Sequence, residues 1–581
     1  MARVLEPRGA AAPGLGLPMA LLGVVWGVVG LAWLVRLAGT SASWLAGNGW
    51  ISPPFGVDFV RLLVGDGVQA VWPGTPTWTV VIVSLLLIAV VTAAGIALTV
   101  LGRRVLVPAQ GLAQAHEVSP LTPAAAKERA RRLRQSLADQ ADRDVAADDV
   151  GLALGVLMPR GPRLRASWED VLLAVMAPRA GKTTTLTVPI VRNAPGPVLA
   201  TSIKPDLWEA TAEERTASTG ERVWVFDPQG VTGREQAMWW NPLRAVTTVE
   251  EATRLAGHFI TEIRGDRDGR DFWSSAAHDL LANLLLAAAL SERSLPEVYE
   301  WLTEPAVPTA ANLLRGHGHH AAAAAIVGRQ NGAVETRDGV YETARTAASA
   351  LRDPVIMRWL VPPRISGATG CEELDTAAFV SSRQTLHLLS KNGAGTAAPL
   401  VAALVDRLMH DGIRAAERSP GARLDPPLVV VLDEAANICK ISDLPDLYSH
   451  LGSRGVVPLT VLQSYRQGVR VWGEAGMDSL WSAATVKLVG AGIDDAKFAE
   501  DVSRLVGEHD VAVRSYADGS GDGSRRASRS VTTSLRRQRL LPPEDLRAMP
   551  KGTALVLATG LRVAQVRLEP YYETPARRGD N

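Results

Sequence analysis

Two long uncharged apolar runs stand near the start of the chain. Leu15–Val35 holds 21 residues and ends before Arg36, and Trp78–Leu101 holds 24 and ends shortly before Arg103. Because about 20 apolar residues cross the hydrocarbon core of a membrane, the pattern predicts two transmembrane helices, over about 15–35 and 78–101. The alternatives are a cleaved signal peptide for the first run and a buried core helix for the second.

Basic residues indicate how these helices are oriented. Arg3 and Arg8 precede the first run, and Arg103 and Arg104 follow the second. The loop between the two runs, residues 39–77, contains one basic residue, Arg61. The positive-inside rule therefore places both termini in the cytoplasm and a short loop outside. We assign residues 1–104 to this membrane anchor, with Trp44, Trp50 and Trp72 of the loop as candidate interface residues.

Residues 105–150 read as a juxtamembrane linker. The segment 121–138 is a strongly charged helix candidate, with Thr122 as a possible cap and Pro123 at the first helical position. It is either a solvated linker helix or a basic helix lying against anionic headgroups.

Beyond residue 150 the pattern changes to short apolar runs of strand length separated by helical stretches. The runs are 170–176, 197–201, 223–226, 428–434, 457–463, 485–489, 553–558 and 563–566. Such alternation predicts an α/β fold, with a sheet of the RecA-like P-loop class.

A phosphate-binding loop follows the first of these strands. The sequence 176–185, MAPRAGKTTT, ends in the Gly-Lys-Thr of that motif but has Met176 in place of its first glycine. Backbone N–H groups at a helix start would hold phosphate, Lys182 would reach the β- and γ-phosphates, and Thr183 would bind Mg²⁺. The candidate ATP-binding residues are Ala177, Pro178, Arg179, Ala180, Gly181, Lys182, Thr183 and Thr184.

A second strand supplies acidic partners for this loop. Leu428–Glu434 is an apolar run that ends in Asp433 and Glu434, a Walker B pattern. Asp433 is predicted to act with Mg²⁺ and Glu434 to polarise the attacking water as a general base. The alternative is a buried strand whose two acids only cap the next turn.

A third strand adds two further candidates. Gln463 ends the run 457–463, and the carboxyl ends of parallel strands form the ligand edge of such sheets, so Gln463 is a candidate γ-phosphate sensor. Arg454, on the loop after a predicted helix 444–451, is a candidate arginine finger for a neighbouring subunit. The alternative for Arg454 is an ordinary surface arginine.

The distance between the two motifs indicates an insertion. Lys182 and Asp433 lie 251 positions apart, and much of the interval has helical periodicity, such as Ala252, Leu255, Ala256, Phe259 and Ile260 after a Thr248–Glu251 capping box. A second stripe, which includes Trp273, runs through residues 272–289. We place an all-α insert at 245–365, between motor segments 151–244 and 366–570, and a disordered tail at 571–581.

Composition adds one constraint. The net charge of +1 excludes a global basic field, so any nucleic-acid contact is local. Residues 514–539 hold seven arginines in a Gly/Ser-rich context and are either a phosphate-binding loop or a hairpin tip between two strands.

The order of these motifs resembles that of the type IV secretion coupling proteins, the TraG/TraD-like conjugative ATPases with a TraM-recognition domain. The resemblance extends over nearly the whole chain. The matching segments are VLATSIKPDLWEAT (198–211), VWVFDP (223–228), WNPL (240–243), DFWSSAAHDLL (271–281), VVVLDEAANI (429–438), SRGVVPLTVLQSYRQ (453–467) and LLPPEDLRAMPKGTALVLATG (540–560).

The resemblance implies a multi-pass ATPase of the bacterial cell membrane that works as a ring hexamer. It would bring a relaxase bound to single-stranded DNA to a type IV secretion channel, contact relaxosome and channel proteins, and drive conjugative DNA transfer with ATP and Mg²⁺. Two other functions stay open: an FtsK-like DNA translocase, and a membrane adaptor that does not hydrolyse ATP or that exports protein cargo.

Overall fold

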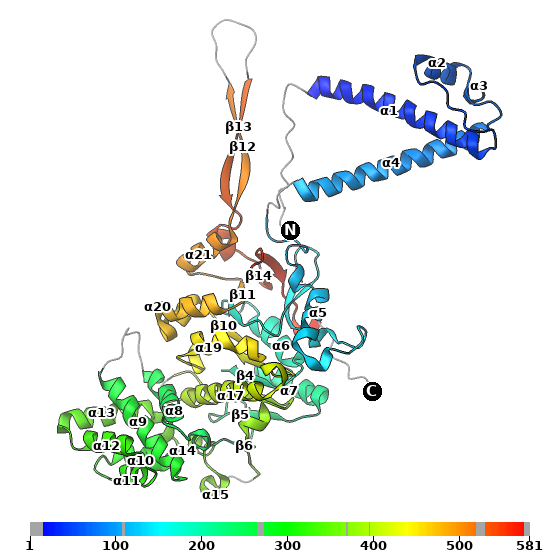
Figure 1. Ribbon diagram of the computed structural model, residues 1–581. Helices are drawn as coiled ribbons and strands as arrows, with labels where there is room; N and C mark the ends of the chain where they lie inside the picture. The colour runs from blue at the N-terminus through cyan, green and yellow to red at the C-terminus, as the bar shows by residue number, and fades with distance from the viewer. Residues whose placement is uncertain are drawn as a thin grey trace. The chain divides into compact units, whose positions relative to one another are not determined.

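The computed structural model divides into two compact units, residues 1–110 and 111–581 (Figure 1). It describes residues 16–106, 111–263, 272–367, 370–393, 395–518 and 529–573. The first unit coincides closely with the apolar N-terminal part of the sequence, and the second holds the α/β part.

The first unit is built on two long helices, α1 (Gly16–Leu45) and α4 (Thr77–Leu106), joined through α2 (Val57–Gly65) and α3 (Val68–Val71). Helix α1 continues past Arg36, whose guanidinium donates to the Pro53 carbonyl at 2.6 Å and to Ser52. The Trp72 ring is fully buried, and its N–H donates to the Ile51 carbonyl at 3.1 Å. Trp72 is therefore a core residue of this unit and not the interface residue that the sequence suggested.

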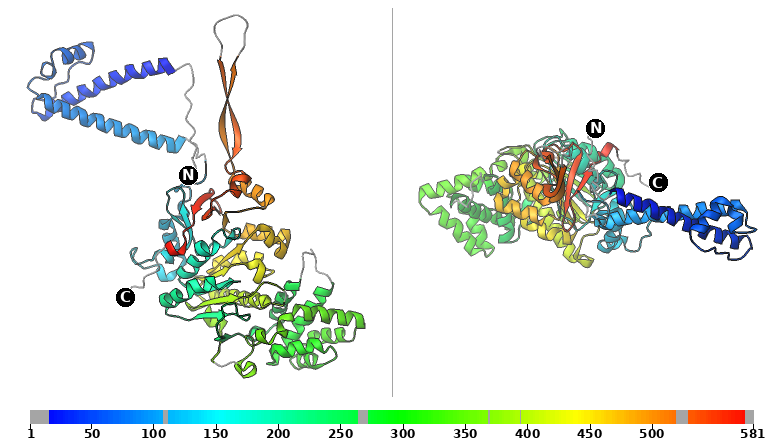
Figure 2. Two further views of the ribbon diagram at one scale, coloured as in Figure 1. Left: turned by 180° about the vertical axis from the view of Figure 1, so that it is seen from behind. Right: turned by 90° about the horizontal axis from the view of Figure 1, so that it is seen from above.

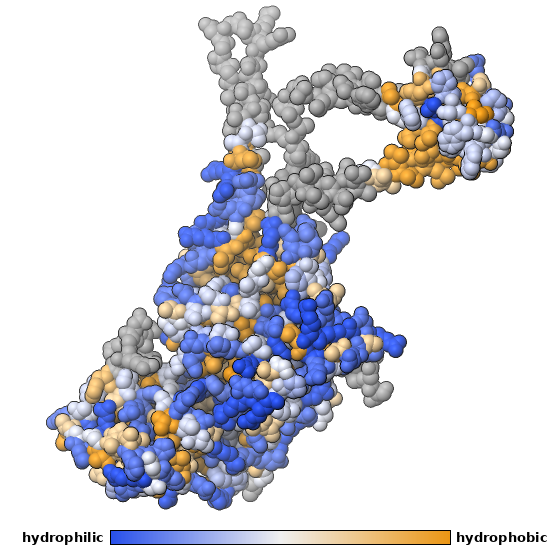
Figure 3. Space-filling model, in the orientation of Figure 1, coloured by the Kyte–Doolittle hydropathy of each residue, from blue (hydrophilic) through white to orange (hydrophobic). Residues whose placement is uncertain are grey.

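Helix α4 carries a large apolar surface (Figure 3). Thr77–Gly95 is long and apolar enough to cross a membrane, and its side chains are almost entirely exposed, with Leu85, Leu86 and Val90 each more than 60% accessible. It is the one such helix in the part of the chain where side chains are described. The other predicted span begins at residue 15, outside the described residues, and the side chains of 16–28 are not described.

The second unit contains a mixed sheet of eleven strands among the residues described. Its order is β2 (Arg163–Ala166), β1 (Leu152–Leu157), β15 (Ala564–Arg567), β14 (Thr553–Ala558), β11 (Val486–Gly490), β3 (Leu172–Val175), β10 (Val456–Leu462), β9 (Leu428–Leu432), β4 (Val198–Ser202), β8 (Thr385–Leu389) and β5 (Val223–Phe226). The run from β11 to β5 is parallel, and β14, β15, β1 and β2 pair antiparallel. The predicted α/β fold is confirmed, and every strand predicted from an apolar run is present.

Helices fill the interval between β5 and β8. The larger ones are α8 (Val249–Ile263), α9 (Phe272–Leu290), α10 (Leu295–Thr303), α11 (Thr309–Gly316), α12 (His320–Gln330) and α13 (Val334–Ala347). They gather at one end of the unit (Figure 2). The predicted stripe of α8 is buried, from Ala252 to Ile260, whereas Trp273 at the start of α9 is 43% exposed.

Three further segments complete the unit. The predicted charged helix is α5 (Pro123–Leu133), with Pro123 at its first turn. Strands β12 (Glu508–Asp518) and β13 (Arg529–Arg539) form a separate antiparallel ribbon, and the arginine-containing tip between them lies outside the described residues. Near the C-terminus Tyr571–Glu573 form a 3-10 turn, with the Arg192 guanidinium 5.2 Å from the Tyr571 ring centroid; residues 574–581 are not described.

Packing explains why Met176 replaces a glycine. Its backbone continues the sheet, since its N–H donates to the Leu462 carbonyl at 2.9 Å, and its side chain is fully buried. The space for this side chain comes from Gly490 at the end of β11, where an added Cβ would lie 2.6 Å from Met176 Cγ. The left-handed residues that turn the chain come later, at Arg179 (φ 62°) and Gly181 (φ 93°). A glycine at position 176 is therefore not needed for the turn.

We expect Gly490→Ala to lower the free energy of unfolding by about 1–3 kcal/mol, because the new methyl group overpacks the site of Met176. Met176→Ala alone should cost about 2–5 kcal/mol through the cavity it leaves. The double variant should lower the free energy of unfolding by less than the sum of the two single effects, because the methyl group of Gly490→Ala fills part of the space that Met176→Ala leaves. Thermal unfolding of the four proteins measures this, with Gly316→Ala on α11, where an added Cβ meets nothing within 4 Å, as the neutral control.

Candidate functional site

Three adjacent parallel strands bring the predicted site residues to one edge of the sheet. Strand β10 lies between β3 and β9 and is parallel to both. The loop with Lys182 follows β3, the pair Asp433–Glu434 follows β9, and Gln463 follows β10. Because the carboxyl ends of parallel strands meet at one edge, residues distant in sequence converge there.

Lys182 is the cation at the centre of this edge. Its Nζ lies 3.3 Å from Asp433 Oδ1 and also contacts Glu434 Oε1. The two carboxylate side chains are only 5% and 6% exposed, and that of Lys182 is 12% exposed. Burial raises the pKa of the Asp433 carboxyl, and the Lys182 ammonium opposes that shift. Two buried carboxylates thus share one ammonium group.

The Glu434 carboxylate is held by two amide side chains as well. Gln463 Nε2 donates to Oε1 at 2.6 Å and to Oε2 at 2.7 Å, and Asn437 Nδ2 donates to Oε2 at 2.7 Å. Glu434 itself has a left-handed backbone, with φ 59°, which is uncommon for a residue with a side chain. Hydrogen bonds from three partners and an unusual backbone fix this carboxylate in one orientation.

The loop after β3 has the features of an anion cradle. Among the described residues, the backbone N–H groups of Arg179 and Gly181 donate to no protein acceptor. After Lys182 the chain enters η4 (Thr183–Thr187), a π-helical turn that continues into α6 (Val188–Asn193). Unpaired N–H groups at a helix start attract phosphate.

The threonines of the loop differ in what their hydroxyls do. Those of Thr184 and Thr185 donate to the Gly181 carbonyl, at 3.1 and 2.9 Å, and so stabilise the loop. Ala177 and Gly181 are partly buried and Ala180 buried, whereas Pro178 and Arg179 are exposed. The loop therefore offers its backbone to a ligand, with Thr183 as the hydroxyl not used inside the loop among the bonds described.

The acidic side of the site fits a divalent cation. Asp433 Oδ1 is buried without a hydrogen-bond partner among the described residues, although the Lys182 ammonium is near. A buried carboxylate oxygen is costly unless a cation binds it. Lys182 supplies that cation in this structure, and a divalent cation would take its place if Lys182 turned to a phosphate. Oxygen ligands of this kind suit Mg²⁺, which prefers one or two carboxylates together with phosphate oxygens and water.

Arg454 lies elsewhere. It ends the 3-10 turn η8 (Gly452–Arg454) just before β10, whereas Gln463 follows β10, so the two residues lie at opposite edges of the sheet. Its guanidinium is 3.5 Å from Glu417, on α17 (Ala398–Arg418). Within one chain, Arg454 is not brought together with Lys182, Glu434 and Gln463.

Two contacts of the site were not predicted from the sequence. Asn437 follows Glu434 by three positions, the spacing at which side chains on one helical turn meet. Thr201, at the end of β4, donates to the Asp433 carbonyl at 2.8 Å. The contact of Asn437 could have been found from its spacing to Glu434. The bond from Thr201 depends on the order of strands in the sheet, which the sequence alone does not give.

Comparison with known proteins agrees with this geometry. Residues 427–551 match the family described as the TraM recognition site of TraD and TraG. Over 410 residues the chain is 23% identical to the conjugal transfer protein TraG of Escherichia coli, with 67% of this chain and 63% of that protein covered. Over 428 residues it is 24% identical to VirD4 of Agrobacterium fabrum, with 71% and 61% covered. The chain thus spans less than two thirds of the length of these relatives.

Solved structures show the same fold. The unbound bacterial conjugative coupling protein TrwBdeltaN70 superposes with a TM-score of 0.53 at 18% identity, covering 74% of this chain and 91% of that one. The plasmid coupling protein TrwB in complex with ADP and Mg²⁺ gives a TM-score of 0.52 at 18% identity, covering 77% and 93%. These findings bear out the resemblance predicted from the sequence motifs: the chain is similar in sequence to the conjugal transfer protein TraG and to VirD4, and similar in fold to the coupling protein TrwB.

Proposed function

We propose that this protein is a membrane-anchored ATPase that brings a relaxase–DNA substrate to a type IV secretion channel and drives conjugative transfer. The observation that carries the proposal is the convergence of Lys182, Asp433, Glu434 and Gln463 from three neighbouring strands. An ammonium group, two carboxylates and an amide beside an anion-binding loop are the groups that phosphoryl transfer from ATP to water requires.

Each of these groups has a role in the proposed reaction. The N–H groups of residues 177–184 hold the phosphates, and Lys182 turns from the carboxylates toward the β- and γ-phosphates. Thr183 and Asp433 hold Mg²⁺, which would neutralise phosphate charge when bound. Glu434 accepts a proton from the attacking water, and Gln463 detects the γ-phosphate. TrwB, to which this chain is similar in fold, has been solved with ADP and Mg²⁺.

We propose a two-helix anchor with both termini in the cytoplasm. Helix α4 supplies one span through Thr77–Gly95, and α1, 30 residues long, supplies the other. An α-helix rises about 1.5 Å per residue, so a 30-residue helix is longer than the roughly 30 Å hydrocarbon core. Arg103 and Arg104 at the end of α4 favour the cytoplasmic side.

The rest of the chain then divides by role. We propose a linker at 105–150, a RecA-like motor formed by 151–244 and 366–570, an all-α insert at 245–365 and a terminal tail at 571–581. The motor would act as a hexamer that binds single-stranded DNA with its relaxase, together with relaxosome and channel proteins. The matched TraM recognition domain and the names of the relatives, conjugal transfer protein TraG and VirD4, favour these partners.

We expect Glu434→Gln to reduce ATP hydrolysis by the full-length protein in detergent at least 100-fold, because it removes the base and keeps the shape. Lys182→Ala should reduce hydrolysis as strongly and also weaken ATP binding. Steady-state phosphate release measures the first effect, and titration with a fluorescent ATP analogue the second.

A matched control is Lys497→Ala on α21 (Ala496–Val506), which removes an exposed lysine whose described ion pair is with Glu474. It should hydrolyse ATP within a few-fold of the wild-type protein. A wild-type protein that binds a relaxase yet hydrolyses no ATP, with or without DNA, would establish the adaptor function instead.

The position of Arg454 predicts action between subunits. Arg454→Ala should lose hydrolysis, and Glu434→Gln should lose it as well, but mixed assemblies should regain part of it. In a mixture, some interfaces join an intact Glu434 of one subunit to an intact Arg454 of the next. Hydrolysis by the mixture that stays at the level of the two separate variants would rule out this role for Arg454.

A further inference from the structure

The segment directly after Glu434 connects the site to the helical insert. It comprises the single helical turn α18 (Ala435–Ile438) and residues 439–443. Asn437 lies in that turn, and in addition to its side-chain bond its N–H donates to the Glu434 carbonyl at 2.8 Å. On the far side of the segment, Trp472 Nε1 donates to the Ile441 carbonyl at 2.7 Å. The segment is thus tied to the carboxylate at one end and to α20 (Tyr465–Ala483) beyond it.

Helix α8 contacts this segment through two ion pairs. Lys440 Nζ lies 3.2 Å from Glu262, and Arg254 lies 3.8 Å from Asp443. The Glu262 side chain is 17% exposed, and burial raises the pKa of its carboxyl while Lys440 opposes the shift. The energy of a partly buried ion pair depends more strongly on the separation of its two charged groups than that of an exposed pair, because water screens it less.

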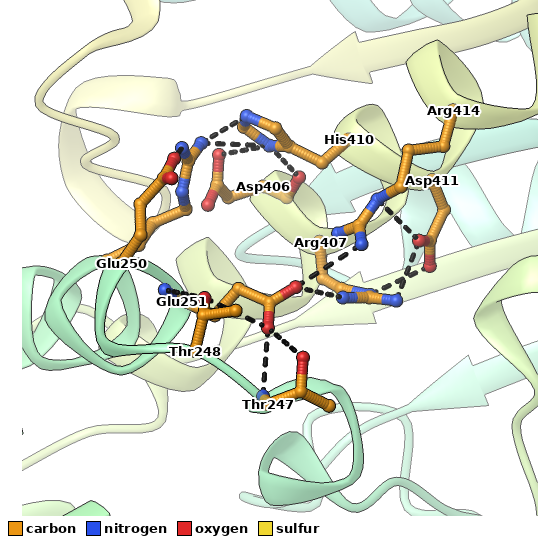
Figure 4. Close-up of polar contacts among 10 residues, drawn as sticks. Thr247, Thr248, Glu250, Glu251, Asp406, Arg407, His410, Asp411 and Arg414 are labelled. Carbon is orange, nitrogen blue, oxygen red and sulfur yellow. Dashed lines mark hydrogen bonds and ion pairs between the residues drawn. The ribbon is translucent and has the colours of Figure 1, made fainter. Parts of the chain in front are cut away.

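The first turns of α8 are fixed on α17 by a polar network (Figure 4). Glu251 accepts from the Thr247 N–H at 2.8 Å and from Arg414 at 3.3 Å, and Arg407 pairs with Asp411 at 2.8 Å. His410 lies beside Asp406, with its Nδ1 3.1 Å from Asp406 Oδ1, and also contacts Arg254. The start of α8 is therefore anchored on α17. Arg254, in its second turn, contacts both His410 and Asp443, and Glu262, in its last turn, meets Lys440.

A cavity of about 670 Å³ lies at the same junction. Asn437 and Lys440 line it from the motor, and Glu262, Tyr299 and Arg352 line it from the helical insert. Asn437 therefore faces the insert while its amide holds the Glu434 carboxylate. Asn437 and Glu262 of α8 thus line the same cavity.

Of the three side chains that hold the Glu434 carboxylate, two have other roles in the proposed reaction. In the proposed reaction, Lys182 turns to the β- and γ-phosphates and Gln463 to the γ-phosphate. Asn437 has no proposed contact with the nucleotide, so its hydrogen bond to the Glu434 carboxylate would remain when ATP is bound. We propose that Asn437 is a positioning residue for Glu434, and that residues 435–443 carry the position of insert helix α8 to that carboxylate. This inference rests on the proposed ATPase function.

The test for Asn437 uses full-length protein in detergent and two substitutions. Asn437→Ala removes a hydrogen bond to a charged group, and we expect kcat for ATP hydrolysis to fall about 10–100-fold. The KM for ATP should change less than threefold, because Asn437 does not touch the phosphate loop. Asn437→Asp, of the same shape, places a second carboxylate against Glu434, so the acidic limb of the kcat profile should move to higher pH.

The control is Asn312→Ala on α11, whose side chain accepts from Arg315 at 2.9 Å on the exposed surface. It should leave kcat and the pH profile unchanged. Thermal unfolding of all variants separates misfolding from a loss of positioning, and the isosteric Asn437→Asp supplies the pH readout even where Asn437→Ala is unstable.

The link to α8 is tested by charge reversal. Lys440→Glu and Glu262→Lys should each lower kcat several-fold, and the double variant should recover most of the loss because the ion pair is restored in reverse. Arg132→Glu, which breaks an exposed ion pair of α5 with Glu128, is the matched control and should have no effect.

The outcomes distinguish this inference from the function on which it rests. Wild-type hydrolysis together with an unchanged kcat and pH profile in both Asn437 variants would overturn the role of Asn437 and leave the ATPase standing. Single reversals at Lys440 and Glu262 without effect, or a double variant without recovery, would overturn the link to α8. A wild-type protein without hydrolysis would overturn both the ATPase and the inference.

Discussion

The burial of two carboxylates beside one ammonium group is the constraint on which the site depends. Asp433 and Glu434 are nearly inaccessible, and Lys182 is the one basic residue with an ion pair to either of them among the described residues. Removing an ion from water costs several kcal/mol, so such a pair persists only where the surrounding geometry is rigid. The rigidity comes from three adjacent parallel strands that are buried along their whole length.

The same sheet explains how an incomplete motif can keep its geometry. A glycine at the start of a phosphate loop is useful if the backbone must turn there, but here the backbone of Met176 still pairs with β10. The turn is delayed to Arg179 and Gly181, and the space for the methionine side chain is provided by Gly490 on the neighbouring strand. The missing glycine of the loop is thus compensated by a glycine distant in sequence.

Much of the fold was predictable, because buried parallel strands read as continuous apolar runs and the insert has helical periodicity. Strand β8 was missed since its five residues include His387, which breaks the apolar run although it is buried. Strands β1 and β2 were missed because Gly155, Arg163 and Arg165 interrupt their patterns. The convergence of Lys182, Asp433 and Gln463 followed from their places at strand ends. The role of Gly490, the burial of Trp72 and the bond from Thr201 depend on tertiary neighbours, which local sequence does not encode.

Under the proposed ATPase function, charge balance favours a further cation supplied by another subunit. Lys182 already compensates two carboxylates, and ATP would add further negative charge at the same place. If Lys182 turns to the phosphates, Asp433 and Glu434 lose their ammonium partner, and a divalent cation at Asp433 restores part of the balance. The charge that develops on the transferred phosphoryl group needs another cation, and Arg454 of the same chain lies at the opposite edge of the sheet. An arginine from a neighbouring subunit would meet that need, which is the role proposed for Arg454.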